Sequence, residues 1–347
     1  MSFICPYSQF RFSMLFRKEL LLFFVLLYGF PSASLADLTT PLSVSNQAPL
    51  IQIYGLPGMS RSLLLPAGVI EAQLSMDVSN HFLHENTGGE SLLLDGESYL
   101  YSLQLSYGVS DRLELSLDIP YVAHQGGQLD GFIDDWHRFF GLPTNGRENG
   151  TKDQLSFIYD DNGTERLSQQ DETKGLGDIR FSGAWQLSEG TDLEPTTIAF
   201  HSSLKLPTGD SEKLTGSGGA DLAVWLSGGR QFPVAWGDLG LITSLGLLFV
   251  GEGEVLEEQQ RSLVWFGGLG IALQPWQRVR LQVQVDFHSS FYHDSRMDGV
   301  DSSSVQLATG GTIILDEGYE IELAVVEDIA VGTAPDVVFH FALRRRF

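Results

Sequence analysis

The stretch Val337-Val338-Phe339-His340-Phe341-Ala342-Leu343-Arg344-Arg345-Arg346-Phe347 closes this chain of 347 residues. Every second residue from Val337 to Leu343 is apolar, and the last residue is aromatic. Successive side chains of a β-strand point to opposite faces, so this period of two predicts a strand with one apolar and one polar face. Such a strand suits a wall that separates lipid from a polar interior.

The same alternation recurs along most of the chain. Apolar residues from Ile70 to Val78 alternate with polar residues, and the clearest example runs from Val279 to Phe287. A tight turn at Ser110-Asp111 would join two such strands into a hairpin. We predict twelve strands, near residues 70–79, 99–109, 113–121, 177–188, 196–207, 220–232, 238–250, 262–274, 278–289, 303–315, 319–328 and 336–347.

The connections between these strands indicate an even number. In membrane barrels the long loops lie outside and short turns face the periplasm, and an even count returns both chain ends to the periplasm. We therefore expect an all-β fold over residues 69–347, a transmembrane antiparallel up-and-down β-barrel of about 12 strands, with ten or fourteen as alternatives. The longer connections, predicted as outer loops, cover residues 83–98, 122–176, 208–219, 251–261, 290–302 and 329–335.

The beginning of the chain has the pattern of a secretory signal. Two basic residues precede an apolar run at residues 20–30, and small residues follow as far as Ala36. The run is shorter than the roughly 20 apolar residues of a membrane-spanning helix. We predict a cleaved signal peptide at residues 1–36, with Met1 or Met14 as the start.

Composition limits the function further. Cys5 is the only cysteine and lies in the predicted signal peptide, so disulfides and cysteine-based catalysis or zinc binding are excluded from the mature chain. The formal net charge of −23 argues against nucleic acid as a partner. We expect no cofactor and no metal site.

The last strand also predicts where the chain resides. A terminal aromatic residue after alternating apolar residues is typical of bacterial outer-membrane barrels, and the barrel-assembly machinery reads it as a signal. We assign this role to Phe341, Leu343 and Phe347. The expected location is the bacterial outer membrane, with its lipids and lipopolysaccharide as surroundings.

The longest predicted loop contains a short amphipathic helix between Gly131 and Pro143. Phe132, Trp136, Phe139 and Phe140 would share its apolar side. This side either caps the barrel mouth or leans on its rim, or it forms a lid over a site for an apolar ligand.

Residues 37–68 precede the first strand and form a separate segment. They contain too many prolines and glycines for a strand but too many apolar residues for a solvated tail. We predict a plug folded into the lumen, with a periplasmic ledge or a partner site as alternatives. Candidate plug residues are Asn46, Gln47, Pro49, Tyr54 and Pro57.

The strand register also predicts which polar side chains line the lumen. Charges of both signs in a confined interior are expected to pair, because unpaired burial is costly. They either fill a narrow barrel as a salt-bridge network or line a polar conduit. The candidates are Glu71, Asp77, Glu114, Asp118, Arg180, His201, Lys205, Arg280, Asp286, His288, Glu320, Glu322, His340 and Arg344.

Several motifs resemble those of a known group of proteins. They are Asn46-Gln47-Ala48-Pro49 with Gly55-Leu56-Pro57, the 132–143 loop helix, Gly175-Leu176-Gly177-Asp178, and Leu204-Lys205-Leu206-Pro207-Thr208-Gly209-Asp210. Together they resemble an uncharacterised family of proteobacterial outer-membrane proteins of unknown function. The last two motifs are also similar to transporter-like proteins linked to meta-pathway phenol degradation. The resemblance implies a barrel, either porin-like or a channel for hydrophobic compounds, and it supplies no catalytic residue.

These observations predict passive uptake or export of a small solute, with a hydrophobic solute as one option. A non-transporting barrel for structure, adhesion or envelope assembly is the alternative. A lipid or peptide hydrolase ranks below both. Histidines near the outer edge could serve it, but no spacing singles out one set and no Gly-x-Ser-x-Gly motif is present. These histidines are His81, His84, His124, His288 and His293.

Overall fold

The computed structural model describes residues 38–127, 131, 154–190, 195–235, 237–330 and 333–347. The predicted signal peptide and the loop-helix residues Phe132, Trp136, Phe139 and Phe140 therefore lie outside the described residues. Within this described part, no helix has the length and apolar character needed to cross a membrane.

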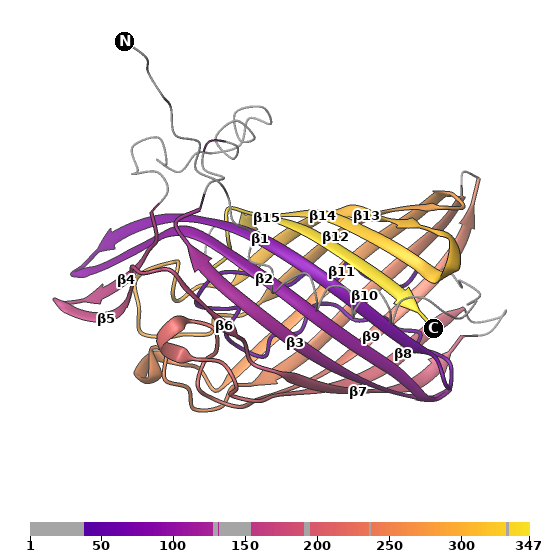
Figure 1. Cartoon of the computed structure of the whole chain (residues 1–347), viewed down its shortest axis with the longest axis horizontal. Coiled ribbons are helices and arrows are strands. Elements are labelled where there is room, and N and C mark those ends of the chain that lie inside the picture. Colours follow the sequence, from indigo (N-terminus) through magenta and orange to yellow (C-terminus); the bar gives the residue numbers. More distant parts are fainter. Residues whose placement is uncertain (1–37, 128–130, 132–153, 191–194, 236, 331–332) are drawn as a thin grey trace, which may run out of the picture.

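Fifteen strands, counted over the described residues, form one antiparallel sheet (Figure 1). Twelve of these strands close into a barrel, because β2 pairs with β3 as well as with β1. The predicted count of twelve is confirmed. The barrel strands are β1 (Ile70–Thr87), β2 (Glu90–Ser110), β3 (Leu113–Gln125), β7 (Arg180–Glu189), β8 (Thr196–Lys205), β9 (Asp221–Val234), β10 (Gly237–Phe249), β11 (Leu263–Trp276), β12 (Val279–His288), β13 (Ser304–Ile314), β14 (Tyr319–Ala330) and β15 (Val337–Arg346).

The other three strands extend the wall at the barrel end that carries the longer loops, called the outer end here. β4 (Ser156–Asp161) pairs with the tip of β2, and β5 (Thr164–Gln169) pairs with β4. β6 (Thr173–Leu176) pairs with the end of β3. Single turns of 3₁₀ helix cover Ser211–Lys213, Glu257–Gln259 and Asp316–Gly318.

Two predicted loops are wrong in part. Residues 83–98 continue β1 and β2 instead of forming a loop, because the buried side chains of Leu92 and Leu94 pack against β4. Part of the predicted loop 122–176 forms β4 to β6. Asn162 and Gly163, at φ 52° and 81°, make the turn of the β4–β5 hairpin, and an Asn-Gly pair favours such a turn.

The two faces of the wall differ in polarity. Leu245 and Leu269 on the outside are 63% and 62% exposed, whereas Ser244 and Gln282 on the inside are buried. Phe341 lies on the exposed side of β15, and Phe347 exchanges backbone hydrogen bonds of 2.8 and 3.3 Å with Ile70. An apolar exterior around a polar interior is the arrangement of a membrane barrel.

Candidate functional site in the barrel lumen

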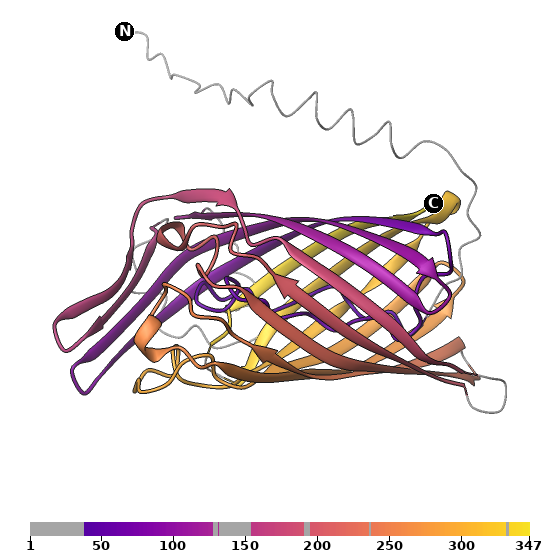
Figure 2. The ribbon, with the colours of Figure 1, turned by 90° about the horizontal axis from the view of Figure 1, so that it is seen from below.

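Residues 38–66 run as a loop through the interior of the barrel, where Figures 1 and 2 show them in indigo. The ascending limb, residues 38–47, rises from the inner end, which is the end that carries the short turns and Phe347. The apex, residues 48–54, turns through backbone hydrogen bonds from the Ile51 and Gln52 N–H groups to the Ala48 carbonyl, both 2.9 Å. The descending limb, residues 55–66, returns to the start of β1.

Near the inner end the limbs lie against β9 and β10, and glycines make this contact possible. A Cβ at Gly240 would lie 2.3 Å from the Leu38 carbonyl oxygen, and one at Gly229 would lie 2.5 Å from the Thr39 Cβ. The limbs also touch each other, since a Cβ at Gly58 would lie 2.4 Å from the Val44 carbonyl oxygen. Any side chain at Gly229 or Gly240 would therefore clash with the loop, so the loop can lie against β9 and β10 only because these residues are glycines.

The predicted plug residues lie in the upper part of this loop. The Asn46 side-chain amide lies 2.8 Å from the His288 Nε2 and donates to the Thr333 carbonyl at 2.6 Å. Its oxygen accepts from the Ala48 N–H at 2.8 Å. The Gln47 side-chain amide donates to the Ser45 carbonyl at 3.3 Å and to the Ser45 hydroxyl at 3.0 Å. Pro49 belongs to the apex, and Pro57 lines a cavity described below.

An apolar core surrounds the apex and closes the outer end of the lumen, and its members are here called the outer cap. The Tyr54 ring stacks on Phe291 at 4.9 Å between centroids, and its hydroxyl donates to the Tyr292 hydroxyl at 3.0 Å. Burial raises the pKa of both tyrosines, so they stay protonated. The outer cap comprises Ala48, Leu50, Ile51, Ile53, Tyr54, Leu56, Leu92, Leu94, Leu155, Phe157, Tyr159, Leu214, Ala223, Trp225, Leu248, Val250, Val255, Leu256, Val264, Phe266, Phe291, Tyr292, Met297 and Val300.

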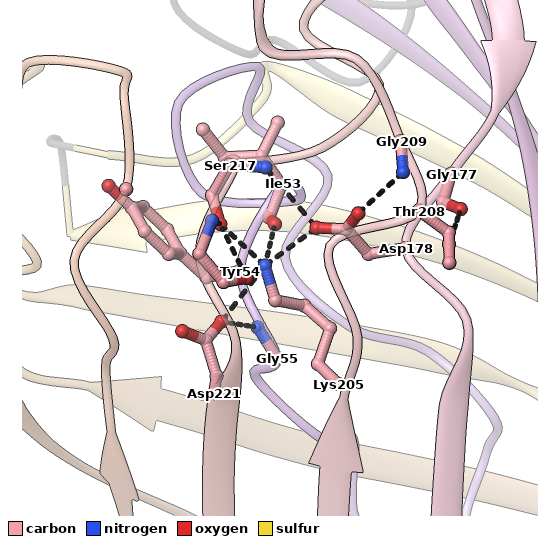
Figure 3. Close-up of polar contacts among 12 residues, drawn as sticks. Ile53, Tyr54, Gly55, Gly177, Asp178, Lys205, Thr208, Gly209, Ser217 and Asp221 are labelled. Carbon is pink, nitrogen blue, oxygen red and sulfur yellow. Dashed lines mark hydrogen bonds and ion pairs between the residues drawn. The ribbon is translucent and has the colours of Figure 1, made fainter.

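Below the outer cap, Lys205 binds the apex through a fully buried ion cluster (Figure 3). Its ammonium group lies 2.6 Å from Asp178 and 3.2 Å from Asp221, and it donates to the Ile53 carbonyl at 3.0 Å. Asp221 in turn accepts from the Gly55 N–H at 2.7 Å. The cluster thus joins β8 and β9 to the loop in the lumen.

The turn motifs noted in the sequence build this cluster. The other oxygen of Asp178 accepts from the Gly209 N–H at 2.7 Å, and the Thr208 hydroxyl donates to the Gly177 carbonyl at 2.8 Å (Figure 3). A Cβ at Gly55 would lie 3.0 Å from the Asp221 Cβ. The Gly-Asp and Pro-Thr-Gly motifs therefore position the anion that holds Lys205.

A second charged network, called the inner network here, lies near the inner end. Glu71 pairs with Arg61 of the descending limb and with Arg346 at 2.7 Å. Arg344 lies 3.8 Å from Glu71 and 3.2 Å from Glu320. The network comprises Arg61, Glu71, Glu320, Glu322, Arg344 and Arg346.

His340 connects the inner network to the ascending limb. Its Nδ1 lies 2.7 Å from Asp77 and its Nε2 lies 3.2 Å from Glu322. The Ser43 N–H donates to the same Glu322 carboxylate at 2.7 Å. The limb is thus held by side chains of β1, β14 and β15.

The remaining predicted lumen residues lie at separate points of the wall. Glu114 accepts from the Leu65 N–H at 2.8 Å, and His201 stacks on Trp225 at 5.1 Å. Arg280 is 1% exposed, and Asp286 accepts from Gln284 at 2.8 Å.

The loop does not fill the lumen, and a cavity of about 210 Å³ remains between it and the wall. Asp118 and Arg180, 3.9 Å apart, line this cavity with Glu114, Asp77 and Arg344. Serines of β1, β2, β3, β7 and β8 line the rest: Ser75, Ser102, Ser116, Ser182 and Ser203. Their side chains are small, which leaves space between these strands and the loop.

Sequence reasoning missed several of these residues. Asp178 and Asp221 stand at strand entries and were not among the predicted lumen residues, although the Gly-Asp motif marked the first. Phe291 and Tyr292 gave a visible signal as two aromatic residues after a strand. The serines gave none, because serine is common in loops and turns as well.

Of the histidines considered for catalysis, His81 and His124 meet at the Ser98 hydroxyl, at 2.9 and 2.8 Å, whereas His288 and His293 have separate partners. His288 binds Asn46 in the lumen, whereas His293 pairs with Asp294 at 2.8 Å in an exposed loop. Over the described residues, no group of three or more histidine, cysteine, aspartate or glutamate side chains could hold a metal ion.

Similarity to known proteins is found at the level of family and of fold. The family model described as "Protein of unknown function (DUF3187)" matches residues 18–347. No curated protein sequence matches the chain. The COG4313 outer membrane channel from Pseudomonas putida F1 is similar with 12% identity and a TM-score of 0.54, over 82% of this chain and 98% of that one. The Ralstonia pickettii toluene transporter TbuX matches with 11% identity and a TM-score of 0.35, over 82% and 91%.

Proposed function

This chain belongs to the family of proteins of unknown function DUF3187, and we propose that it is an outer-membrane channel for passive passage of a small solute. Residues 38–66 act as its plug. The signal peptide and the terminal signal of Phe341, Leu343 and Phe347 deliver the chain to the barrel-assembly machinery. Lipid and lipopolysaccharide then surround the apolar exterior.

One observation carries the proposal: the loop in the lumen is not part of the wall. Residues 38–66 belong to no strand, and the wall holds them largely through side chains such as Lys205, Glu322 and Glu114. The loop could therefore leave without breaking any strand pairing of the barrel. Its departure would join the existing cavity to a polar lumen, which is what a solute path requires.

A non-transporting barrel is the second candidate, and the outer cap favours it. An apolar core of this size contributes to stability and would resist opening. In that case the loop is a permanent filling, and the barrel serves structure, adhesion or envelope assembly.

Conductance across a planar lipid bilayer tests the channel directly. The mature chain is compared with a variant in which a Gly/Ser linker of equal length replaces residues 38–66. We expect low conductance for the mature chain and a steady, larger conductance for the variant, because the linker forms none of the side-chain contacts.

The matched control replaces residues 160–165, the exposed turn of the β4–β5 hairpin, by a linker of the same kind and should stay close to the mature chain. Each protein must first migrate differently on a gel before and after boiling, as a folded barrel does. A folded linker variant that conducts no current would overturn the channel proposal and leave the non-transporting barrel.

A further inference from the structure

The cavity beside the loop contains buried groups that lack partners. The Arg180 Nε and the Trp225 Nε1 are buried N–H donors without a hydrogen-bond partner among the residues described. Both residues line the cavity of about 210 Å³. A buried donor left unpaired is costly, so such groups in a native protein call for an acceptor supplied by water or a ligand.

The Arg180 guanidinium has more hydrogen-bond donors than the protein groups around it use. Its closest carboxylate, Asp118, is 3.9 Å away and already accepts a hydrogen bond from Ser102. One terminal nitrogen reaches the Tyr54 carbonyl at 3.3 Å. A guanidinium has five N–H donors, so most of this set is open to an anion in the cavity.

The other charges on the cavity wall have partners from the protein. Arg61 and Arg344 pair with the glutamates of the inner network, and Asp77 pairs with His340. Glu114 accepts from the Leu65 N–H. Arg180 is therefore the cation most available to a solute.

The rest of the lining favours hydroxyl groups over hydrocarbon. Serines from five wall strands and from both limbs of the loop face the cavity. Each hydroxyl can donate once and accept twice, so one bonded to a neighbour, such as Ser182 to Ser203 at 3.0 Å, still has capacity. Asp118 can accept a further hydrogen bond from a solute hydroxyl.

We propose that this cavity is a binding site for a small polyhydroxylated carboxylate, whose anionic group binds Arg180 and whose hydroxyls bind the serines. The volume is below the ~300–1,000 Å³ of sites for drug-sized ligands, which fits a molecule of six carbons or fewer. The site deepens the proposed function, because it names the class of solute that the channel would select.

Equilibrium dialysis of the full mature chain in detergent, with radiolabelled gluconate, tests the site even if entry is slow. Gluconate should bind, while glucitol, which has the same carbon chain without the carboxylate, should bind at least tenfold more weakly. Arg180→Gln should weaken gluconate binding about tenfold or more and leave glucitol unchanged, since a hydrogen bond to a charged group is lost. Trp225→Phe should weaken both ligands by a smaller factor.

Arg112→Gln is the matched control, because the Arg112 side chain is 70% exposed and does not line the cavity. This variant should bind gluconate as the unchanged protein does. Equal binding of gluconate to the Arg180→Gln variant, no gluconate binding, or preferential binding of toluene would each overturn the site. Failure of the channel itself would appear separately, as a silent linker variant in the bilayer.

Discussion

The two ends of the lumen hold the same loop by different forces. At the outer end the apex lies in an apolar core, with Ile51 and Tyr54 fully buried. At the inner end the limbs meet the charged side chains of the inner network. Apolar burial depends on volume and has no direction, whereas a buried ion network depends on the presence of each partner.

The Lys205 cluster is the exception that sharpens this contrast, because it places a charge directly under the outer cap. Lys205→Met would leave Asp178 and Asp221 buried without their cation and should lower the free energy of unfolding by about 4 to 5 kcal/mol. The measurement is the midpoint of urea unfolding in lipid vesicles. Adding Asp178→Asn and Asp221→Asn should recover most of the loss. If Lys205→Met alone were as stable as the unchanged protein, the outer end would depend on apolar contacts alone.

Arg344→Gln tests the inner network in the same assay. Glu320 would lose the ion pair described for it, whereas Glu71 would keep Arg61 and Arg346. We expect a loss near 3 kcal/mol, the lower part of the range for breaking a buried pair. Glu320→Gln in the same chain should restore stability, and no recovery would mean that Arg344 acts through packing.

Ile51→Ala removes volume from the outer cap without changing charge. The expected loss is about 2 kcal/mol, the low end for such truncations, because a loop apex can relax into the space. Ile51→Leu, which conserves volume, should cost less than about 1.5 kcal/mol. If Ile51→Leu were as unstable as Ile51→Ala, the stability of the outer cap would not depend on the volume of its side chains.

The smallest effect concerns Glu90, at the tip of β2 beyond the barrel wall. Burial raises the pKa of Glu90, but hydrogen bonds from Ser295, the Arg296 N–H and Tyr159 outweigh this, and its pKa lies below the ordinary 4.5. The resulting stabilisation is present above about pH 4.5 and is lost as the pH falls through the lower folded value. Hydrogen exchange of residues 294–297, corrected for its intrinsic pH dependence, should therefore quicken on acidification.

Glu90→Gln is the control for this effect. In that variant the exchange rate of the same amides, corrected for intrinsic pH dependence, should stay constant across the acidic range. If exchange in the Glu90→Gln variant still quickens at low pH, the acid response belongs to a group other than Glu90.

Local pattern made much of the barrel predictable. The strands at residues 279–287 and 337–343 can be predicted from the alternation of apolar and polar residues alone. Each strand shows this pattern independently of the others. The strand segments at the outer end were harder to predict. Residues 83–98 contain short polar stretches that resemble a loop, and only the pairing of β1 with β2 and of β2 with β4 made them strands.

The sequence by itself determined that apolar and polar residues alternate along this chain, how many strands form the barrel wall and which face of each of these strands is polar. These features depend on neighbours one or two residues away. Only the tertiary structure decided that Lys205 lies between Asp178 and Asp221, and that Arg180 and Trp225 border one cavity. These groups are far apart in sequence, and the closure of the barrel and the course of residues 38–66 bring them together. Register assigns a residue to the lumen, but the partner it meets there depends on the whole wall.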